Sequence, residues 1–277
     1  MRNVRNVAIL AGVILAAASM SAADVLLDTG GFEGFATGSV EGQNGWTGNM
    51  NVYDRSTHEF WAGAYPAGAP GKGLASQALE ARRSLGAYTD ANKACQVDYS
   101  MYLCSYGANV ISVDMQIEQF AGSGNRSFPV TVRVTNDGNG TAFKVQAIKS
   151  DVGGTVNETM YDSQADDDLL FYSSEKTRLD ISVTFNLKTD SFDLSITQWT
   201  PATWIAGEPV RTININDIAA IPVADNDVTM VLRFIGRLSG SNATMIDNVV
   251  VQSVPEPGTI SLLVGGLGCL LARGRRK

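Results

Sequence analysis

The chain has 277 residues, of which 44% are hydrophobic and 18% are charged, and its formal net charge is −7. The segment 24–254 keeps 15 of the 21 Lys and Arg residues and 27 of the 28 Asp and Glu residues, so its formal charge is −12. Nucleic acid and anionic lipid surfaces repel a domain of this charge, so neither is expected as a partner. The segment is long enough for one large all-β domain with a hydrophobic core.

The first 23 residues have the pattern of a secretory signal peptide, MRNVRNVAILAGVILAAASMSAA. Arg2 and Arg5 form a positive n-region, and Val7 to Ala18 form an apolar core of the usual length, expected to be a helix. Small residues at its end predict cleavage by signal peptidase after Ala23. A retained N-terminal anchor is the alternative. The pattern predicts export, and residues 1–23 lie outside the fold.

Aromatic residues gather in loop-like sequence soon after the expected cleavage site: Trp46, Tyr53, Trp61 and Tyr65. Exposed rings stack on the apolar faces of pyranoses, so these four are candidate sugar-binding residues. The alternative is that the rings close the ends of the core, which is the usual role of half-buried aromatic side chains.

Apolar and polar residues alternate with period two through the middle of the chain, in the segments 111–118, 130–135, 179–187, 192–197, 230–234 and 249–251. Turn-forming residues at 136–140 and 188–191 separate neighbouring segments. Helical spacing predicts one short helix near 75–85. Many strands joined by short turns predict an antiparallel, two-sheet jelly-roll sandwich over residues 24–253.

Two cysteines, Cys95 and Cys104, flank a strand-like segment of this domain. An exported protein meets an oxidising environment, so a disulfide between them is predicted, with two unpaired thiols as the alternative. The single histidine, His58, and the absence of a CxxC motif argue against a transition-metal site.

The last 24 residues, VPEPGTISLLVGGLGCLLARGRRK, have three parts in a fixed order. Pro255, Glu256 and Pro257 come first and break off the preceding domain, because proline restricts its own backbone and that of the residue before it. An uncharged apolar run at 258–272 follows, and then the basic cluster Arg273, Arg275, Arg276 and Lys277. If the apolar run enters a membrane, this basic cluster is expected to hold the C-terminus on the cytoplasmic side.

This order closely resembles the PEP-CTERM sorting signal of exported bacterial proteins. The resemblance implies a transmembrane helix that anchors residues 254–277 transiently in the inner membrane. It also implies an exosortase that recognises the proline triplet and removes the helix and basic tail. The expected location is the cell envelope or extracellular matrix, and exopolysaccharide is the ligand that the family suggests. A plain membrane anchor is the alternative.

The two ends of the domain carry a second resemblance. Phe32-Glu33 and the loop Gly42-Gln43-Asn44-Gly45-Trp46 open the domain, and Asp247-Asn248 begins its last apolar segment. These features resemble concanavalin-A-like, laminin-G-type jelly-roll domains, in which the first and last strands are neighbours. The resemblance implies that Glu33 and Asp247 approach one another, where carboxylate oxygens could bind a structural calcium ion.

Motifs for catalysis are weak. No GxSxG, HExxH or phosphate-binding glycine loop occurs, and a non-enzyme is expected. The nearest approach to a glycosidase carboxylate pair is Asp114 and Glu118, which alternation places on the solvent side of one strand. A glycan-active enzyme of the jelly-roll glucanase type, using these two residues, is one alternative. A purely structural surface protein is the other.

Overall fold

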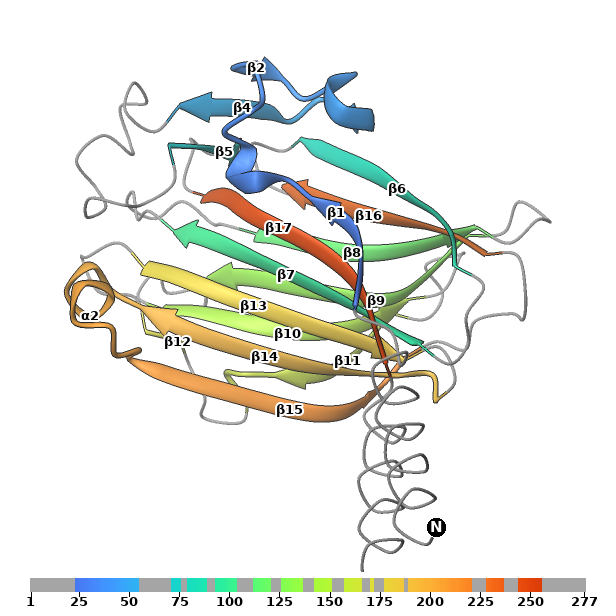
Figure 1. Ribbon diagram of the computed structural model, residues 1–277. Helices are drawn as coiled ribbons and strands as arrows, with labels where there is room; N and C mark the ends of the chain where they lie inside the picture. The colour runs from blue at the N-terminus through green and yellow to red at the C-terminus, as the bar shows by residue number, and fades with distance from the viewer. Residues whose placement is uncertain are drawn as a thin grey trace, which may run out of the picture.

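The computed structural model describes residues 23–54, 71–75, 79–88, 93–103, 112–120, 126–136, 142–150, 157–165, 170–171, 177–186, 189–220, 228–236 and 244–255. These residues form two β-sheets packed face to face, which is the predicted jelly-roll sandwich (Figure 1). Every strand pairing among them is antiparallel.

The first sheet, sheet A, contains the two ends of the domain. Its strands in spatial order are β15 (Arg211–Ala219), β14 (Ser191–Trp199), β13 (Thr177–Asn186), β7 (Lys93–Leu103), β17 (Thr244–Pro255), β5 (Lys72–Ala75), β4 (Asn51–Asp54) and β2 (Gly38–Ser39). The first strand, β1 (Asp24–Asp28), pairs with the last, β17, which confirms that the first and last strands are neighbours.

The second sheet, sheet B, lies behind sheet A in Figure 1. Its strands in spatial order are β11 (Asn157–Asp162), β10 (Ala142–Ser150), β9 (Arg126–Asn136), β8 (Ser112–Phe120), β16 (Val228–Gly236), β6 (Glu80–Tyr88) and β3 (Trp46–Gly48), with β12 (Leu170–Phe171) beside β10. Short helical turns occur at η1 (Gly30–Phe32), η2 (Gln43–Gly45) and α2 (Pro201–Ala206). No helix in the described part of the chain is long and apolar enough to cross a membrane.

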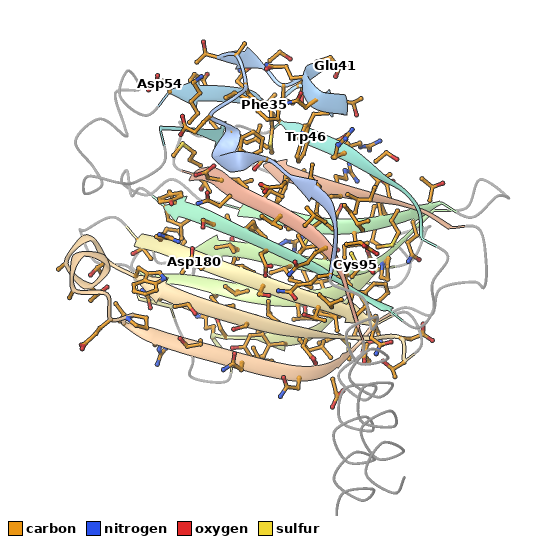
Figure 2. The ribbon with its side chains drawn as sticks, in the orientation of Figure 1. Phe35, Glu41, Trp46, Asp54, Cys95 and Asp180 are labelled. Atoms are coloured by element: carbon orange, nitrogen blue, oxygen red, sulfur yellow. The ribbon has the colours of Figure 1, made fainter. Side chains whose placement is uncertain are left out.

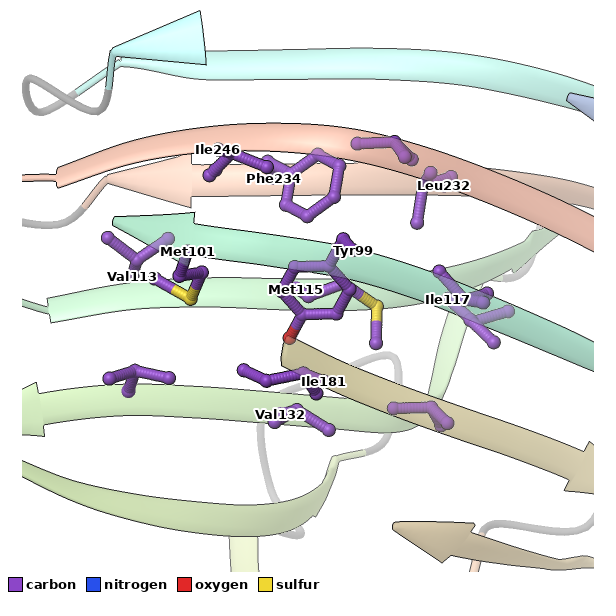
Figure 3. Close-up of a cluster of buried hydrophobic side chains, with 14 of the residues drawn as sticks. Tyr99, Met101, Val113, Met115, Ile117, Val132, Ile181, Leu232, Phe234 and Ile246 are labelled. Atoms are coloured by element: carbon purple, nitrogen blue, oxygen red, sulfur yellow. The ribbon is translucent and has the colours of Figure 1, made fainter. Parts of the chain in front are cut away.

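Side-chain alternation explains why these segments form a sandwich. In β13 every second residue is buried, because successive side chains of a strand point to opposite faces of the sheet. Figure 3 shows the centre of the core, where Tyr99 of β7 lies among Met115, Val132, Ile181 and Phe234 from four other strands. The Tyr99 and Phe234 rings meet edge to face, 5.4 Å apart. The core therefore draws its residues from both sheets.

Two predictions about secondary structure have different outcomes. The turn at 188–191 joins β13 to β14, and their register runs from Asn186–Ser191 to Arg178–Trp199, so this hairpin is confirmed. The short helix predicted near 75–85 is wrong, because β5 reaches Ala75 and β6 begins at Glu80. Residues 80–88 pair with β16, and this sheet pairing prevails over a weak helical spacing.

The predicted Cys95–Cys104 disulfide is also wrong. Cys95 is a free, buried thiol, and burial raises its pKa to about 12. It lies near one end of the continuous strand β7, which ends at Leu103, the residue bonded to Cys104. Eight strand residues span roughly 26 Å, far more than the 7 Å or less that a disulfide allows between Cα atoms. Residues 1–22, which hold most of the expected signal peptide, and 256–277, which hold most of the expected sorting signal, lie outside the described residues.

Candidate functional site

A groove crosses the outward face of sheet A, over β7, β13, β14 and the bend in β17. Its volume is about 330 Å³, and its lining consists mostly of short polar side chains: Asp98, Tyr99, Ser100, Arg178, Asp180, Ile181, Ser182, Ser195, Thr197 and Asn248. Figure 2 labels Asp180, on β13, within this part of the sheet. This groove is a surface feature able to receive a ligand.

The strand register arranges the groove residues in rows across the sheet. Ser182 stands opposite both Asp98 on β7 and Ser195 on β14. One row further, Asp180 stands opposite Ser100 and Thr197. Opposed side chains in antiparallel strands have Cβ atoms about 4.5–5.5 Å apart, so each row forms a continuous polar band. The floor of the groove is low because the side chains that form it are mainly the short ones of Ser and Thr.

Asp180 organises one end of this face. Its Oδ1 accepts hydrogen bonds from Ser100 Oγ at 2.7 Å and from Arg178 Nε at 2.6 Å. Its Oδ2 accepts one from the indole Nε1 of Trp199 at 2.8 Å. The Arg178 guanidinium also lies over the Tyr102 ring, 5.8 Å from its centroid. Asp180 thus holds Arg178 and the half-buried Trp199 in fixed positions beside the groove.

Other side chains of the groove are held less firmly than those around Asp180. Asp98 accepts hydrogen bonds on both carboxylate oxygens from Gln96 Nε2, at 3.0 and 2.9 Å. Ser195 Oγ donates to Asn214 Oδ1 at 2.7 Å, and Thr197 shares a 3.2 Å hydrogen bond with Thr212. Each of these groups keeps lone pairs or hydroxyl hydrogens that can bind a polar ligand.

The predicted sugar-binding aromatics do not line this groove. Trp46 has no exposed surface and packs in the core against Phe32 and Phe234, so its selection as a sugar platform is wrong. A further aromatic contact, between Phe32 and Phe35, helps to close that end of the sandwich, as the alternative interpretation expected. Tyr53 is half-buried on β4, away from the groove lining. Trp61 and Tyr65 lie outside the described residues.

The predicted pair Glu33 and Asp247 lies near enough for the two charges to interact, where η1 contacts β17 in the interior of the same sheet. Glu33 follows η1, which contacts β17, and its charge acts on the Asp247 carboxyl. A Cβ on Gly31 would lie 3.5 Å from Asp247 Oδ1 and 3.3 Å from Asn248 Oδ1, so η1 passes directly over these oxygens. Gly31 also has a φ of 71°, which favours glycine.

Asp247 is the buried member of this pair. It has no exposed surface, and neither carboxylate oxygen has a hydrogen-bond partner among the described residues. Burial raises its pKa to about 7, the Glu33 carboxylate raises it too, and the nearby Asn248 backbone and Arg178 act in the opposite direction. Glu33 Oε1 accepts hydrogen bonds from the backbone N–H groups of Gly71, at 2.6 Å, and Lys72, at 3.1 Å.

A larger acidic cluster is absent from this part of the molecule. Among the described residues, no three or more His, Cys, Asp or Glu side chains gather as a metal site. The oxygens available near Asp247 are therefore those of two carboxylates and the Asn248 amide. Carboxylate and amide oxygens are the ligand types that calcium prefers.

The outward face of sheet B holds Asp114 and Glu118, the carboxylates of the alternative enzyme hypothesis. They share one face of β8, as alternation predicted, but both have no exposed surface, so the predicted solvent position is wrong. Arg133 donates to both Asp114 oxygens, from Nε at 2.7 Å and from a terminal nitrogen at 3.0 Å. This two-bond pair gives Asp114 a structural role.

Sequence reasoning missed the groove. The residues that line it are the polar members of the alternating segments. Alternation alone predicts only that such residues face the solvent. One signal could have pointed to them: the polar positions of 178–186 and 191–199 are mostly Ser, Thr and Asp, where an ordinary solvent face also carries Lys and Glu.

Comparisons with known proteins concern the fold. No protein-family model matches the chain, and no curated protein sequence matches it. Among solved structures, the CBM2 module of the evolved Dit protein of Lactobacillus casei BL23 phage J-1 is 10% identical, with 84% of this chain and 96% of that chain covered and a TM-score of 0.48.

Two further solved structures are a xylan-binding module and a lectin. The xylan-binding CBM22-1 domain of Paenibacillus barcinonensis Xyn10C is 12% identical, with 85% and 97% coverage and a TM-score of 0.36. Peanut lectin is 9% identical, with 79% and 94% coverage and a TM-score of 0.43. At these identities the likeness is one of architecture. The fold and the groove define a jelly-roll β-sandwich domain with a polar outward face.

Proposed function

We propose that this protein binds polysaccharide without catalysis, in the groove on sheet A, as an exported protein of the cell envelope or extracellular matrix. The observation that supports the proposal is the polar groove itself. Four hydroxyl side chains share two rows of the groove with Asp98 and Asp180: Ser100, Ser182, Ser195 and Thr197.

The chemistry of this face fits a sugar polymer. Each sugar ring presents hydroxyls that both donate and accept hydrogen bonds, and the Ser and Thr hydroxyls of the groove can do the same. The open groove lies on a flat sheet rather than in a closed pocket, which suits a long chain passing across the strands. Asp180 fixes Trp199 through its indole N–H, so a large amphipathic side chain stands ready at one end of the face.

Binding can be tested by affinity gel electrophoresis of the full-length protein, in a non-ionic detergent without a sugar headgroup, through gels that contain soluble polysaccharides. Ser195→Leu fills the groove with a bulky apolar side chain and should weaken binding roughly tenfold or more, because the site loses hydroxyl contacts that a polar ligand needs. Thr159→Leu is the matched control, at an exposed position on β11 of the other sheet. Retardation by no polysaccharide, or equal binding by both variants, would refute the proposed site.

Export and sorting form the second part of the proposal. They rest on the signal-like segment 1–23 and the resemblance of 254–277 to a PEP-CTERM signal, with signal peptidase and an exosortase as processing partners. The inner membrane would hold the protein only until the tail is removed. Mass spectrometry of the mature protein tests this, since a C-terminus that still contains Arg273 to Lys277 would show a retained anchor.

Calcium is proposed as a structural cofactor at Glu33 and Asp247. The support is a carboxylate that is fully buried yet has no hydrogen-bond partner among the described residues, next to a second carboxylate. A bound divalent cation would compensate both charges and hold η1 against β17. The residues present supply hard oxygen donors, which fit this ion.

A glycan-active enzyme is the competing function. It would use Glu118, since Asp114 is engaged by Arg133. Product analysis of a broad polysaccharide panel separates the two functions. Release of shorter sugars that disappears in Glu118→Gln would establish the enzyme, and its absence supports a binding role.

A further inference from the structure

The charges around the groove on sheet A are mainly negative. Asp98 and Asp180 line it, and a third carboxylate, Asp193, stands opposite Thr184 in a neighbouring row. Arg178 is the one cationic side chain in the groove lining. The whole segment 24–254 carries a formal charge of −12, so the surroundings add to this local excess of negative charge.

Arg178 is already engaged by the protein. Its Nε donates to Asp180, its guanidinium lies over the Tyr102 ring, and its side chain is only 20% exposed. Recognition of a carboxylate or sulfate normally uses an arginine that presents two free parallel N–H groups. With Nε held by Asp180, the Nε edge of the guanidinium cannot form such a pair with a ligand.

Asp98, in contrast to Arg178, stays available to a ligand. The one donor that reaches both of its oxygens is the neutral amide of Gln96, and no Lys or Arg pairs with it in the part of the chain that the structure describes. The Asp98 carboxylate can therefore accept further hydrogen bonds. Neighbouring hydroxyls of a sugar ring, or a protonated amine, are donors that suit it.

We infer that the groove selects glycans that are uncharged or carry free amines, and rejects uronate and sulfated glycans. This inference rests on the proposed polysaccharide binding and names its ligand class. A uronate placed in the groove would face Asp98 with no free cation to balance it. A neutral ring meets only hydrogen-bonding partners there, and an ammonium group gains a charge-assisted hydrogen bond.

The test compares polymers of one backbone that differ in charge. Hydroxyethyl cellulose is paired with carboxymethyl cellulose, and methyl-esterified polygalacturonate is paired with its de-esterified form, in gels run on the full-length protein. We expect the anionic member to bind roughly tenfold more weakly at low ionic strength, with a difference that shrinks as salt is added. Deacetylated chitosan oligosaccharides should bind more tightly than the N-acetylated forms.

Two variants assign the selectivity to the groove. Asp98→Asn should reduce the ratio between the neutral and anionic partners. Glu158→Gln removes the same charge from the exposed edge of sheet B and should leave that ratio unchanged. Anionic polymers that bind as tightly as their neutral partners would overturn the inference while the binding function stands. Retardation by none of the polymers would overturn both.

Discussion

Trp199 and Asp180 are joined across the β13–β14 hairpin by a 2.8 Å hydrogen bond from the indole Nε1 to Oδ2. Asp180 also binds Ser100 and Arg178, so one carboxylate connects three strands of sheet A on the face that carries the groove. Outward-facing side chains of a sheet are usually independent of one another. Here they form a preorganised surface, and several of its properties can be measured.

Trp199→Phe tests this connection. The substitution keeps an aromatic ring and removes the indole N–H, so Asp180 loses one of its donors. The expected loss in the free energy of unfolding is about 1 kcal/mol, since the carboxylate is partly exposed and water can replace the donor. Urea denaturation measures it. A larger effect on polysaccharide binding than on stability would show that the ring itself contacts the ligand, and no effect on either would refute its organising role.

Arg133→Met tests the buried ion pair on sheet B. The substitution leaves Asp114 with no exposed surface and without its two-bond partner. Removing one member of such a pair typically costs about 3–5 kcal/mol, because an uncompensated charge stays buried. Guanidinium denaturation of Arg133→Met beside the double variant Arg133→Met with Asp114→Leu separates the two effects. The double variant should recover much of the loss, and failure to do so would show that the arginine acts by packing alone.

Tyr99→Phe should not destabilise the protein. The Tyr99 hydroxyl lies inside the core with no hydrogen-bond partner among the described residues, and burial raises its pKa well above the usual range. A buried hydroxyl without a partner costs free energy, so its removal should raise the melting temperature or leave it unchanged. A clear fall in the melting temperature would reveal a partner for this hydroxyl. Tyr99→Leu is the contrasting variant, since it loses the ring contact with Phe234.

Asp247 should make stability depend on pH when calcium is absent. Its pKa is about 7 in the folded chain and 3.8 as the ordinary value, so the folded state binds the proton more tightly. Stability is therefore highest below the ordinary pKa and falls as pH rises toward 7. Melting temperatures measured with a chelator should show this slope, and Asp247→Asn should flatten it.

Added calcium should reverse this dependence of stability on pH. The ion binds the deprotonated carboxylate, so it should raise the melting temperature at pH 7 and above and have little effect near pH 4. Asp247→Asn should lose most of the shift, whereas Glu158→Gln, which removes an exposed carboxylate on sheet B, should keep it. An equal shift in all three proteins would place the bound calcium elsewhere.

The alternation of particular residues made the fold predictable. Every second side chain of β13 points into the core, as period two requires: Leu179, Ile181, Val183 and Phe185. The short turn after β13 predicts the hairpin between β13 and β14. The approach of Glu33 to Asp247 could also be expected, because the first and last strands pair. Local pattern and a terminal resemblance were sufficient for these features.

Other features depend on three-dimensional packing that sequence patterns do not encode. Trp46 lies in glycine-rich, loop-like sequence but is buried by Phe32 and Phe234. Phe32 lies outside the strand that holds Trp46, and Phe234 is far from Trp46 in the sequence. The disulfide between Cys95 and Cys104 was predicted from the oxidising location, although the strand-like segment between them, now seen as the continuous strand β7, holds its two ends far apart. The groove needs the registers of three strands at once, so it could not be derived from any single segment.

The position of β17 has a consequence for how the chain folds. This strand, residues 244–255, lies inside sheet A, with β7 on one side and β1 and β5 on the other. Until it is synthesised, β7 has an open edge, β1 has no partner strand, and β5 pairs only with β4. The earlier strands therefore cannot close into a finished sandwich during elongation. The last strand therefore completes sheet A, and its pairing extends to Pro255, the first residue of the proposed sorting motif, which stands opposite Lys93.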